Sequence, residues 1–298
     1  MRIINSFLIA SVLIVSSSCA LNKIFLAPHE LSQDSSFNRY VEEYNDTLSL
    51  SFNEDKSPKI VDSKNKEIDL PYTIESLFFP NRNGTNLNAW LMGPKDEFNG
   101  TMIYFLHGNA GNIAYQFALA TPFVERGYKV FMIDYSGFGF SEGKAKRKNV
   151  IIDANDGLKY LLERDDIDYE RLLIYGQSLG GHLSAVVATQ NQEHIDGVII
   201  EGAFSSHKDI ANEQVPLLGR LFTREMYSAK KNIGLCKKPV LIIHSTEDTR
   251  IPYHHGEVLY EAANAPKSMY TIDKPHVRGP LFYADSISLR MEQMISIQ

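Results

Sequence analysis

The sequence predicts an α/β protein with a mostly parallel sheet and helices on both of its faces. From residue 101 onward, short apolar runs of strand length alternate with longer helical segments, which is the pattern of a parallel sheet. Two further strand-like runs joined by a turn precede this alternation, at residues 75–79 and 87–92. The chain has 298 residues, of which 44% are hydrophobic and 22% are charged. It is therefore long enough to bury a sizeable core.

The individual elements follow from the same pattern. Residues 80–86 join the first two strands and contain the hairpin signal Asn83-Gly84. Further strands are expected at residues 101–106, 129–135, 172–175, 198–200, 240–244 and 269–272. Helices are expected at residues 114–126, 149–163 and 280–295, and directly after the strand at 172–175. Residues 206–238 lack strand character, and we expect them to form a small cap.

The first 19 residues have the parts of a secretory signal. Arg2 precedes an apolar core at residues 7–15, which is too short to span a bilayer as a permanent helix. The serines that follow end in Cys19, and this arrangement resembles a bacterial lipoprotein signal. The resemblance implies an exported protein that is acylated on Cys19 and anchored in a membrane of the cell envelope. Ser16 departs from the pattern, because an aliphatic residue usually stands there, and ordinary cleavage near Cys19 or Ala20 is the alternative.

Residues 20–70 are polar and contain few apolar side chains. We expect them to form a tether, loosely packed at residues 51–66, with a short helix near residues 40–44. The folded domain is therefore predicted to span residues 71–298.

Composition excludes several classes of function. A formal charge of −6 and the absence of a basic stripe argue against nucleic acid as a partner. Two cysteines exclude a disulfide scaffold. No spacing of histidines, cysteines and carboxylates indicates a metal site, and no glycine-rich phosphate loop follows the first strand. We therefore expect no metal and no cofactor, and the sequence leaves the oligomeric state open.

The strand at residues 172–175 leads into Gly176-Gln177-Ser178-Leu179-Gly180, which is a G-x-S-x-G motif followed by a helical run. This strand–turn–helix context is the one in which the motif forms a nucleophile elbow. The turn is so sharp that glycines are needed two positions before and after the serine. The hydroxyl of Ser178 is then exposed at the carboxyl edge of the sheet.

A serine hydroxyl becomes a useful nucleophile when a base, usually histidine, removes its proton, and a carboxylate orients that base. Ser178, Asp248 and His276 have the chain order expected for this fold, and each lies just after a predicted strand. His254 and His255 are the alternative bases, but they precede a strand that the base is expected to follow. The alternative acids are Glu201, Glu247 and Asp273.

Four motifs in the same order resemble those of α/β-hydrolase-superfamily serine hydrolases, in the branch of the serine-aminopeptidase-like hydrolases and the membrane-associated protein depalmitoylases. They lie at residues 106–112, 134–143, 176–181 and 244–252, and the resemblance covers residues 72–298. It implies an oxyanion hole made of the backbone N–H groups of Asn109 and Leu179. Two departures concern Ser136, where an arginine is usual, and residues 274–278, which lack the common Gly-His-Asn/Asp pattern.

These observations predict an exported serine hydrolase that cleaves the ester or thioester of a small-molecule or acylated substrate through an acyl-enzyme. A serine peptidase is the alternative enzyme. A catalytically inactive hydrolase fold that serves as a binding protein is the alternative outside the enzymes.

Overall fold

The computed structural model describes residues 25–41 and 45–296. Its centre is an eight-stranded sheet with the order β13-β12-β11-β10-β7-β9-β6-β5. All neighbouring strands run parallel except at β6, which is antiparallel to both β5 and β9, so the predicted hairpin and parallel sheet are confirmed. The strands are β5 (Tyr72–Pro80), β6 (Asn86–Pro94), β7 (Thr101–Leu106), β9 (Lys129–Ile133), β10 (Arg171–Gln177), β11 (Gly197–Glu201), β12 (Val240–Ser245) and β13 (Lys267–Ile272).

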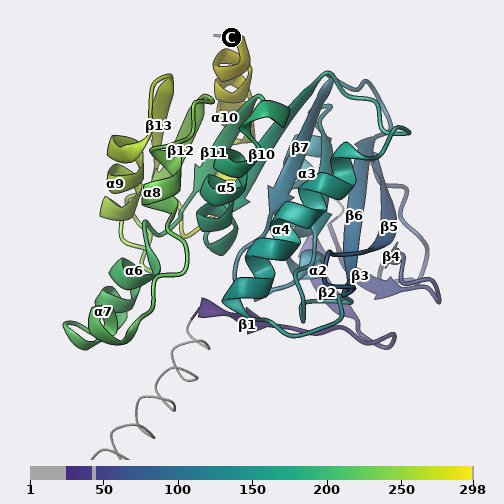
Figure 1. Cartoon of the computed structure of the whole chain (residues 1–298). Coiled ribbons are helices and arrows are strands. Elements are labelled where there is room, and N and C mark those ends of the chain that lie inside the picture. The colour runs from purple at the N-terminus through teal and green to yellow at the C-terminus, as the bar shows by residue number, and fades with distance from the viewer. Residues whose placement is uncertain (1–24, 42–44, 297–298) are drawn as a thin grey trace, which may run out of the picture.

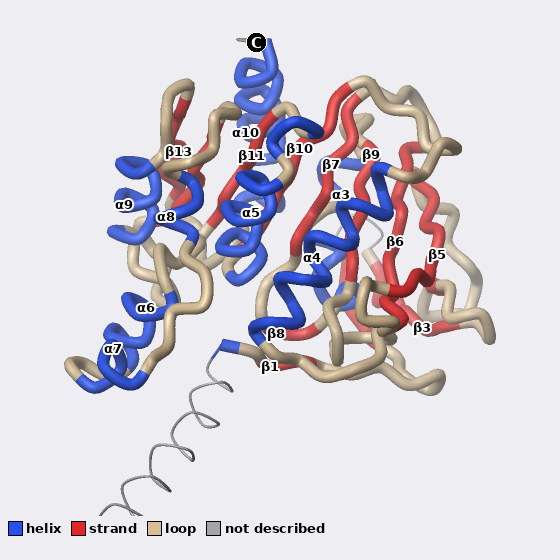
Figure 2. Tube along the Cα trace, in the orientation of Figure 1, coloured by secondary structure: helices blue, strands red, loops and turns tan. Residues whose placement is uncertain are grey.

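Helices cover both faces of this sheet (Figures 1 and 2). The strand residues alternate between two separate cores: Tyr104 packs in one and Phe105 in the other. The first core includes side chains of α4 (Arg147–Leu162), α5 (Leu179–Gln190) and α8 (Ala229–Ile233). The second includes side chains of α2 (Ile113–Gln116), α3 (Thr121–Val124) and α10 (Gly279–Ser296). A further helix, α9 (His254–Ala262), lies between β12 and β13 in the chain.

The single helix expected at residues 114–126 is divided into three pieces. Helix α2 is followed by the 3-10 helix η2 (Phe117–Leu119), and α3 begins at Thr121 with Pro122 in its first turn. Proline has no N–H to donate and crowds the preceding turn, so a helix that contains it is interrupted upstream. The prediction of one continuous helix was wrong for this reason.

The predicted cap has no strand and consists of α6 (His207–Gln214), α7 (Leu218–Phe222) and α8. In Figure 1, α6 and α7 project from one end of the molecule, beyond the carboxyl edge of β11.

The segment predicted as a tether has a regular fold, as far as the structure describes it. Strands β2 (Phe37–Val41), β3 (Asp46–Phe52) and β4 (Pro58–Val61) form an antiparallel sheet of their own, and β1 (Ala27–Pro28) pairs with β8 (Ala110–Gly111). The side chains of Leu48, Leu50 and Phe52 are buried in the second core. Their alternation with polar residues is a strand pattern, so the prediction of a loose tether was wrong, and so was that of a helix near Tyr40.

Among the described helices, none combines the length and the apolar character that crossing a bilayer requires. Residues 1–19, with the predicted signal and Cys19, lie outside the described residues.

Candidate active site

Ser178 occupies the turn between β10 and α5 with a backbone φ of +55° and ψ of −114°. This conformation is rare for a residue with a side chain, and such strain is found at functional sites. A Cβ added to Gly180 would lie 1.9 Å from the carbonyl oxygen of Leu106, and one added to Gly176 would lie 2.0 Å from Ser184 Oγ. The two glycines are therefore required by close packing, as the sequence predicts.

Asp248 and His276 are hydrogen-bonded to one another. His276 Nδ1 donates to Asp248 Oδ2 over 2.6 Å, while the backbone N–H groups of Arg250 and Ile251 donate to Oδ1 over 2.9 Å. Burial opposes ionisation of Asp248, but the bond from His276 and these backbone bonds outweigh it and lower the pKa of the carboxyl. Asp248 is therefore a carboxylate that fixes the tautomer and orientation of the imidazole.

Ser178 and His276 line the same cavity, whose volume is about 590 Å³. Asn109 and Leu179, the residues implied for the oxyanion hole, also line it. Its other walls come from α6 of the cap, from α2 and η2, from β2 and the segment before β1, and from the loops after β7, β11, β12 and β13. The structure thus brings all five predicted site residues together, with Asp248 directly behind His276.

A family model described as alpha/beta hydrolase fold matches residues 101–232. The uncharacterized protein YfhR of Escherichia coli strain K12 is 36% identical over 214 residues, which cover 70% of this chain and 75% of the relative. The chain belongs to the α/β-hydrolase superfamily.

Other relatives and solved structures agree with this assignment. The protein bem46 of Schizosaccharomyces pombe is 30% identical over 212 residues, or 69% of this chain and 70% of the relative. An esterase of Pyrococcus furiosus superposes with a TM-score of 0.61 at 18% identity, over 76% of this chain and 92% of the esterase. Est1E of Butyrivibrio proteoclasticus, in a structure with ferulic acid bound, also superposes with a TM-score of 0.61 at 18% identity. The match covers 74% of this chain and 99% of Est1E. These two structures show the fold alone.

Two of the alternative acids, Glu201 and Asp273, have other partners in this hydrolase. Glu201 is buried and accepts hydrogen bonds from the Tyr175 hydroxyl (2.7 Å), Gln177 Nε2 (2.7 Å) and the Gly279 N–H (2.8 Å). Burial raises the pKa of Glu201, against the effect of these bonds. Because its partners come from β10 and from the start of α10, Glu201 holds the loop that carries His276 next to the sheet. Asp273, in contrast, accepts a hydrogen bond from Tyr283 at the surface.

The alternative bases, His254 and His255, are not among the residues that line the cavity. His255 is buried, and its Nδ1 lies 3.0 Å from the Ser205 hydroxyl, while His254 lies 3.5 Å from Glu213. His244 donates from Nε2 to the Ile251 carbonyl over 2.9 Å, and burial lowers its pKa. It packs behind Asp248, with 3.7 Å between its Nε2 and Asp248 Oδ2.

The N-terminal segment contributes to the site, which the sequence prediction missed. Phe25 and Arg39 line the cavity. The Ala27 N–H donates to Asn109 Oδ1 over 2.6 Å, so the segment also contacts the loop of the implied oxyanion hole. The alternation in residues 48–52 is the signal that indicates a folded segment here.

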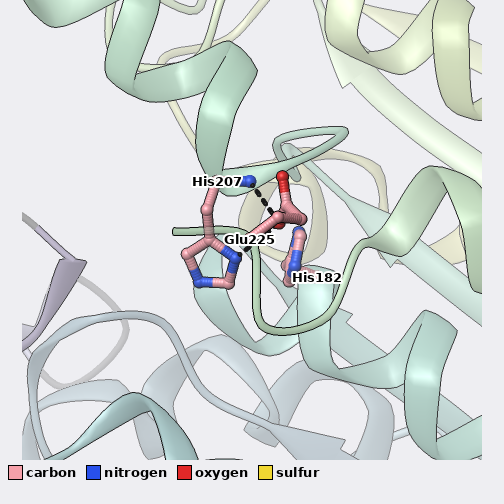
Figure 3. Close-up of side chains that lie close together, drawn as sticks. All are labelled: His182, His207 and Glu225. Carbon is pink, nitrogen blue, oxygen red and sulfur yellow. Dashed lines mark hydrogen bonds and ion pairs between the residues drawn. The ribbon is translucent and has the colours of Figure 1, made fainter. Parts of the chain in front are cut away.

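A second cluster missed by the sequence prediction joins the cap to the elbow helix (Figure 3). It consists of His182 on α5, His207 at the start of α6 and Glu225 in the loop before α8. His207 Nδ1 donates to Glu225 Oε1 over 3.1 Å, and the N–H groups of His207 and Lys208 donate to the same carboxylate. His182 Nδ1 lies 2.9 Å from the Phe204 carbonyl oxygen.

The charges of this cluster are set by burial and by these bonds. Burial opposes the ionisation of Glu225, but the hydrogen bonds from His207 and Lys208 outweigh it and lower the pKa to about 2. Burial, with the neighbouring His207, lowers the pKa of His182 to about 3, so that its ring is neutral at pH 7. One ligand atom from each of the three residues lies within 4.8 Å of the others, as a divalent ion requires. Glu225 accepts three hydrogen bonds from the first turn of α6, and these fasten the loop before α8 to that helix.

Proposed function

We propose that the chain is a serine hydrolase that cleaves a carboxylic ester or thioester through an acyl-enzyme intermediate. The observation that carries the proposal is the position of Ser178, in a strained turn on the wall of the cavity that His276 also lines, with Asp248 hydrogen-bonded to His276 over 2.6 Å.

In the proposed reaction, Ser178 Oγ attacks the substrate carbonyl carbon while His276 Nε2 takes the hydroxyl proton. The negative charge on the carbonyl oxygen is stabilised by the N–H groups of Asn109 and Leu179, because both are fixed in place before the reaction begins. The intermediate collapses, and the leaving alkoxide or thiolate takes the proton from His276. Water then attacks the acyl-enzyme by the same route, which releases the acid and restores Ser178.

The charges around the cavity favour an ester or thioester over a peptide with a free amino group. Three arginines, Arg39, Arg250 and Arg278, line the cavity, and none of the described lining residues is an aspartate or glutamate. An aminopeptidase needs an anion to bind the substrate ammonium group, and the positive arginine side chains would repel that group. The arginines suit an acyl substrate that is neutral or carries a negative charge.

We also propose export to the cell envelope, with Cys19 as the site of acylation. The support is the order Arg2, apolar core, small residues and cysteine in the first 19 residues.

The test is labelling of the purified chain with a fluorophosphonate, followed by hydrolysis of p-nitrophenyl acyl esters and of aminoacyl nitroanilides. We expect a covalent adduct on Ser178 and ester turnover that falls by about 10⁶-fold in Ser178→Ala. Ser184→Ala is the matched control, because Ser184 lies on α5, the helix that follows Ser178, and donates to the Gly180 carbonyl over 2.7 Å. A folded chain without an adduct or turnover would support the inactive binding protein instead, and a preference for the nitroanilides would support the peptidase.

A further inference from the structure

Helix α7 of the cap and the residues on either side of it expose large apolar side chains. Leu217, just before the helix, is 85% exposed and Leu221 is 73% exposed, while Gly219 is buried against the α6 backbone. We call the following set the cap patch: Val215, Leu217, Leu218, Leu221, Phe222 and Met226, all of them exposed.

Such a surface is costly in water. An exposed apolar patch of this kind marks a site of interaction with another protein or a membrane. Leu217 also has a backbone φ of +67°, which bulky residues rarely adopt. The cap patch is therefore a surface that needs a partner.

The charge of the cap identifies the kind of partner. Residues 206–238 carry seven lysines and arginines against three aspartates and glutamates, although the whole chain has a formal charge of −6. Arg224, Lys230 and Lys231 are exposed close to the cap patch in the chain. Exposed apolar side chains with exposed basic ones near them in the chain match the interface of a membrane with anionic lipids, which attracts basic residues close to its surface.

The start of the described chain lies at the same end of the molecule. The Phe25 ring packs against His207, the first residue of α6, with 5.0 Å between the ring centroids. Figure 1 shows α7 and β1 at one end of the fold. Cys19, the proposed acylation site, lies six positions before Phe25. A membrane held by an acyl group at Cys19 would therefore face the cap.

We propose that the cap patch inserts into the interface of an anionic phospholipid bilayer and so turns the catalytic cavity toward the membrane. Helix α6 connects the two features, because Ile210 and Gln214 line the cavity while α7 follows three residues after α6 ends. Arg39, Arg250 and Arg278 line the same cavity as these two residues of α6 and add positive charge there. This proposal concerns a surface and does not depend on the proposed reaction.

The experiment measures how deeply single positions lie in a membrane. The full chain with Cys19→Ala and Leu221→Cys is labelled with an environment-sensitive fluorophore and mixed with vesicles of phosphatidylethanolamine and phosphatidylglycerol that contain spin-labelled lipid. Cys236, the other cysteine, is fully buried and does not compete for the label. Leu289→Cys is the matched control, since Leu289 is an exposed leucine on α10, 52% exposed and far from the cap in the chain.

We expect strong quenching of the fluorophore at position 221 and weak quenching at position 289. Vesicles of phosphatidylcholine alone should reduce the quenching at 221 several-fold, because the basic residues then lack a counter-charge. Equal quenching at the two positions, or none at either, would overturn the proposal. A second result would also overturn it. If the emission of the fluorophore at position 221 changed with protein concentration in the absence of vesicles, the cap patch would bind a second copy of the chain. Quenching at 221 that is unaffected by lipid charge would overturn the selection for anionic lipid.

Discussion

His276 Nδ1 and Asp248 Oδ2 are 2.6 Å apart, although the two residues come from different loops. The loops follow β12 and β13, which are parallel neighbours in register at His244–Thr271 and Ser245–Ile272. Parallel neighbours place the loops at their carboxyl ends side by side. The hydrogen bond is therefore a consequence of the sheet order.

Replacing Asp248 by Asn should lower kcat by about 10⁴-fold with little change in the thermal unfolding midpoint. The backbone bonds from Arg250 and Ile251 to Oδ1 are kept in the amide, so the loop should stay folded. An amide NH₂ facing His276 Nδ1 would favour the tautomer that carries its proton on Nε2, which is unable to accept the proton of Ser178. The measurement is the steady-state hydrolysis of a p-nitrophenyl ester.

Asp273→Asn is the matched control for this change. Asp273 is an exposed carboxylate three residues before His276 and bonds to Tyr283. Its replacement should leave kcat within about twofold of the wild type, as is usual for surface substitutions. A loss of activity as large as that of Asp248→Asn would contradict the assignment of the acid.

Most of the central fold was predictable, because apolar runs and glycine motifs are local signals. The elbow is the clearest case: the close contacts at Gly176 and Gly180 are visible in the sequence as glycines at fixed spacing from Ser178. The pairing of Asp248 with His276 was predictable only through the chain order of the motifs and the resemblance. Neither residue type nor spacing alone shows whether Asp248 or Glu201 is the acid. The structure distinguishes them, because Tyr175 and Gln177 donate hydrogen bonds to Glu201.

The remaining features depend on contacts between distant segments. Phe25 meets His207, which is 182 positions away, and no local pattern indicates this contact. Glu225 reaches His207 across the cap, and such a pair is visible only when α6 and the loop before α8 are placed. The N-terminal sheet was missed because its polar composition concealed the alternation of Leu48, Leu50 and Phe52.

Glu225 should stabilise the fold in a pH-dependent manner. The hydrogen bonds from His207 and Lys208 hold its folded-state pKa at about 2, below the ordinary value of 4.5. A group whose pKa is lowered by folding contributes stability that is fully present above its unfolded pKa. That contribution should be lost as the pH falls from about 4.5 toward 2. We expect Glu225→Gln to lower the free energy of unfolding by about 1–2 kcal/mol at pH 7, a value reduced for the partial exposure of the group.

The measurement is denaturant unfolding of wild type and Glu225→Gln at several pH values, with the difference between the two plotted against pH. The difference should shrink on acidification. Glu213→Gln is the control, since Glu213 is an exposed residue of α6 that lies 3.5 Å from His254. A difference for Glu225→Gln that stays constant down to about pH 3 would mean that its carboxylate charge does not contribute to stability.

The N-terminal sheet should contribute to the stability of the whole domain, and Phe52 is the residue that tests this most directly. Its ring is buried in the second core and packs edge-on against Phe140 with 4.8 Å between the centroids. Removing a buried phenylalanine side chain typically costs about 3–5 kcal/mol, because apolar contact is lost and a cavity remains. Phe52→Ala should therefore lower the free energy of unfolding of the full chain by about 3 kcal/mol or more. The neighbouring Ser51 points to the opposite face of β3. Ser51→Ala should therefore change the free energy of unfolding by less than about 0.5 kcal/mol. If both variants unfolded at the same denaturant concentration as the wild type, the N-terminal sheet would fold independently of the core. Phe25 and Arg39 would then line the cavity only part of the time.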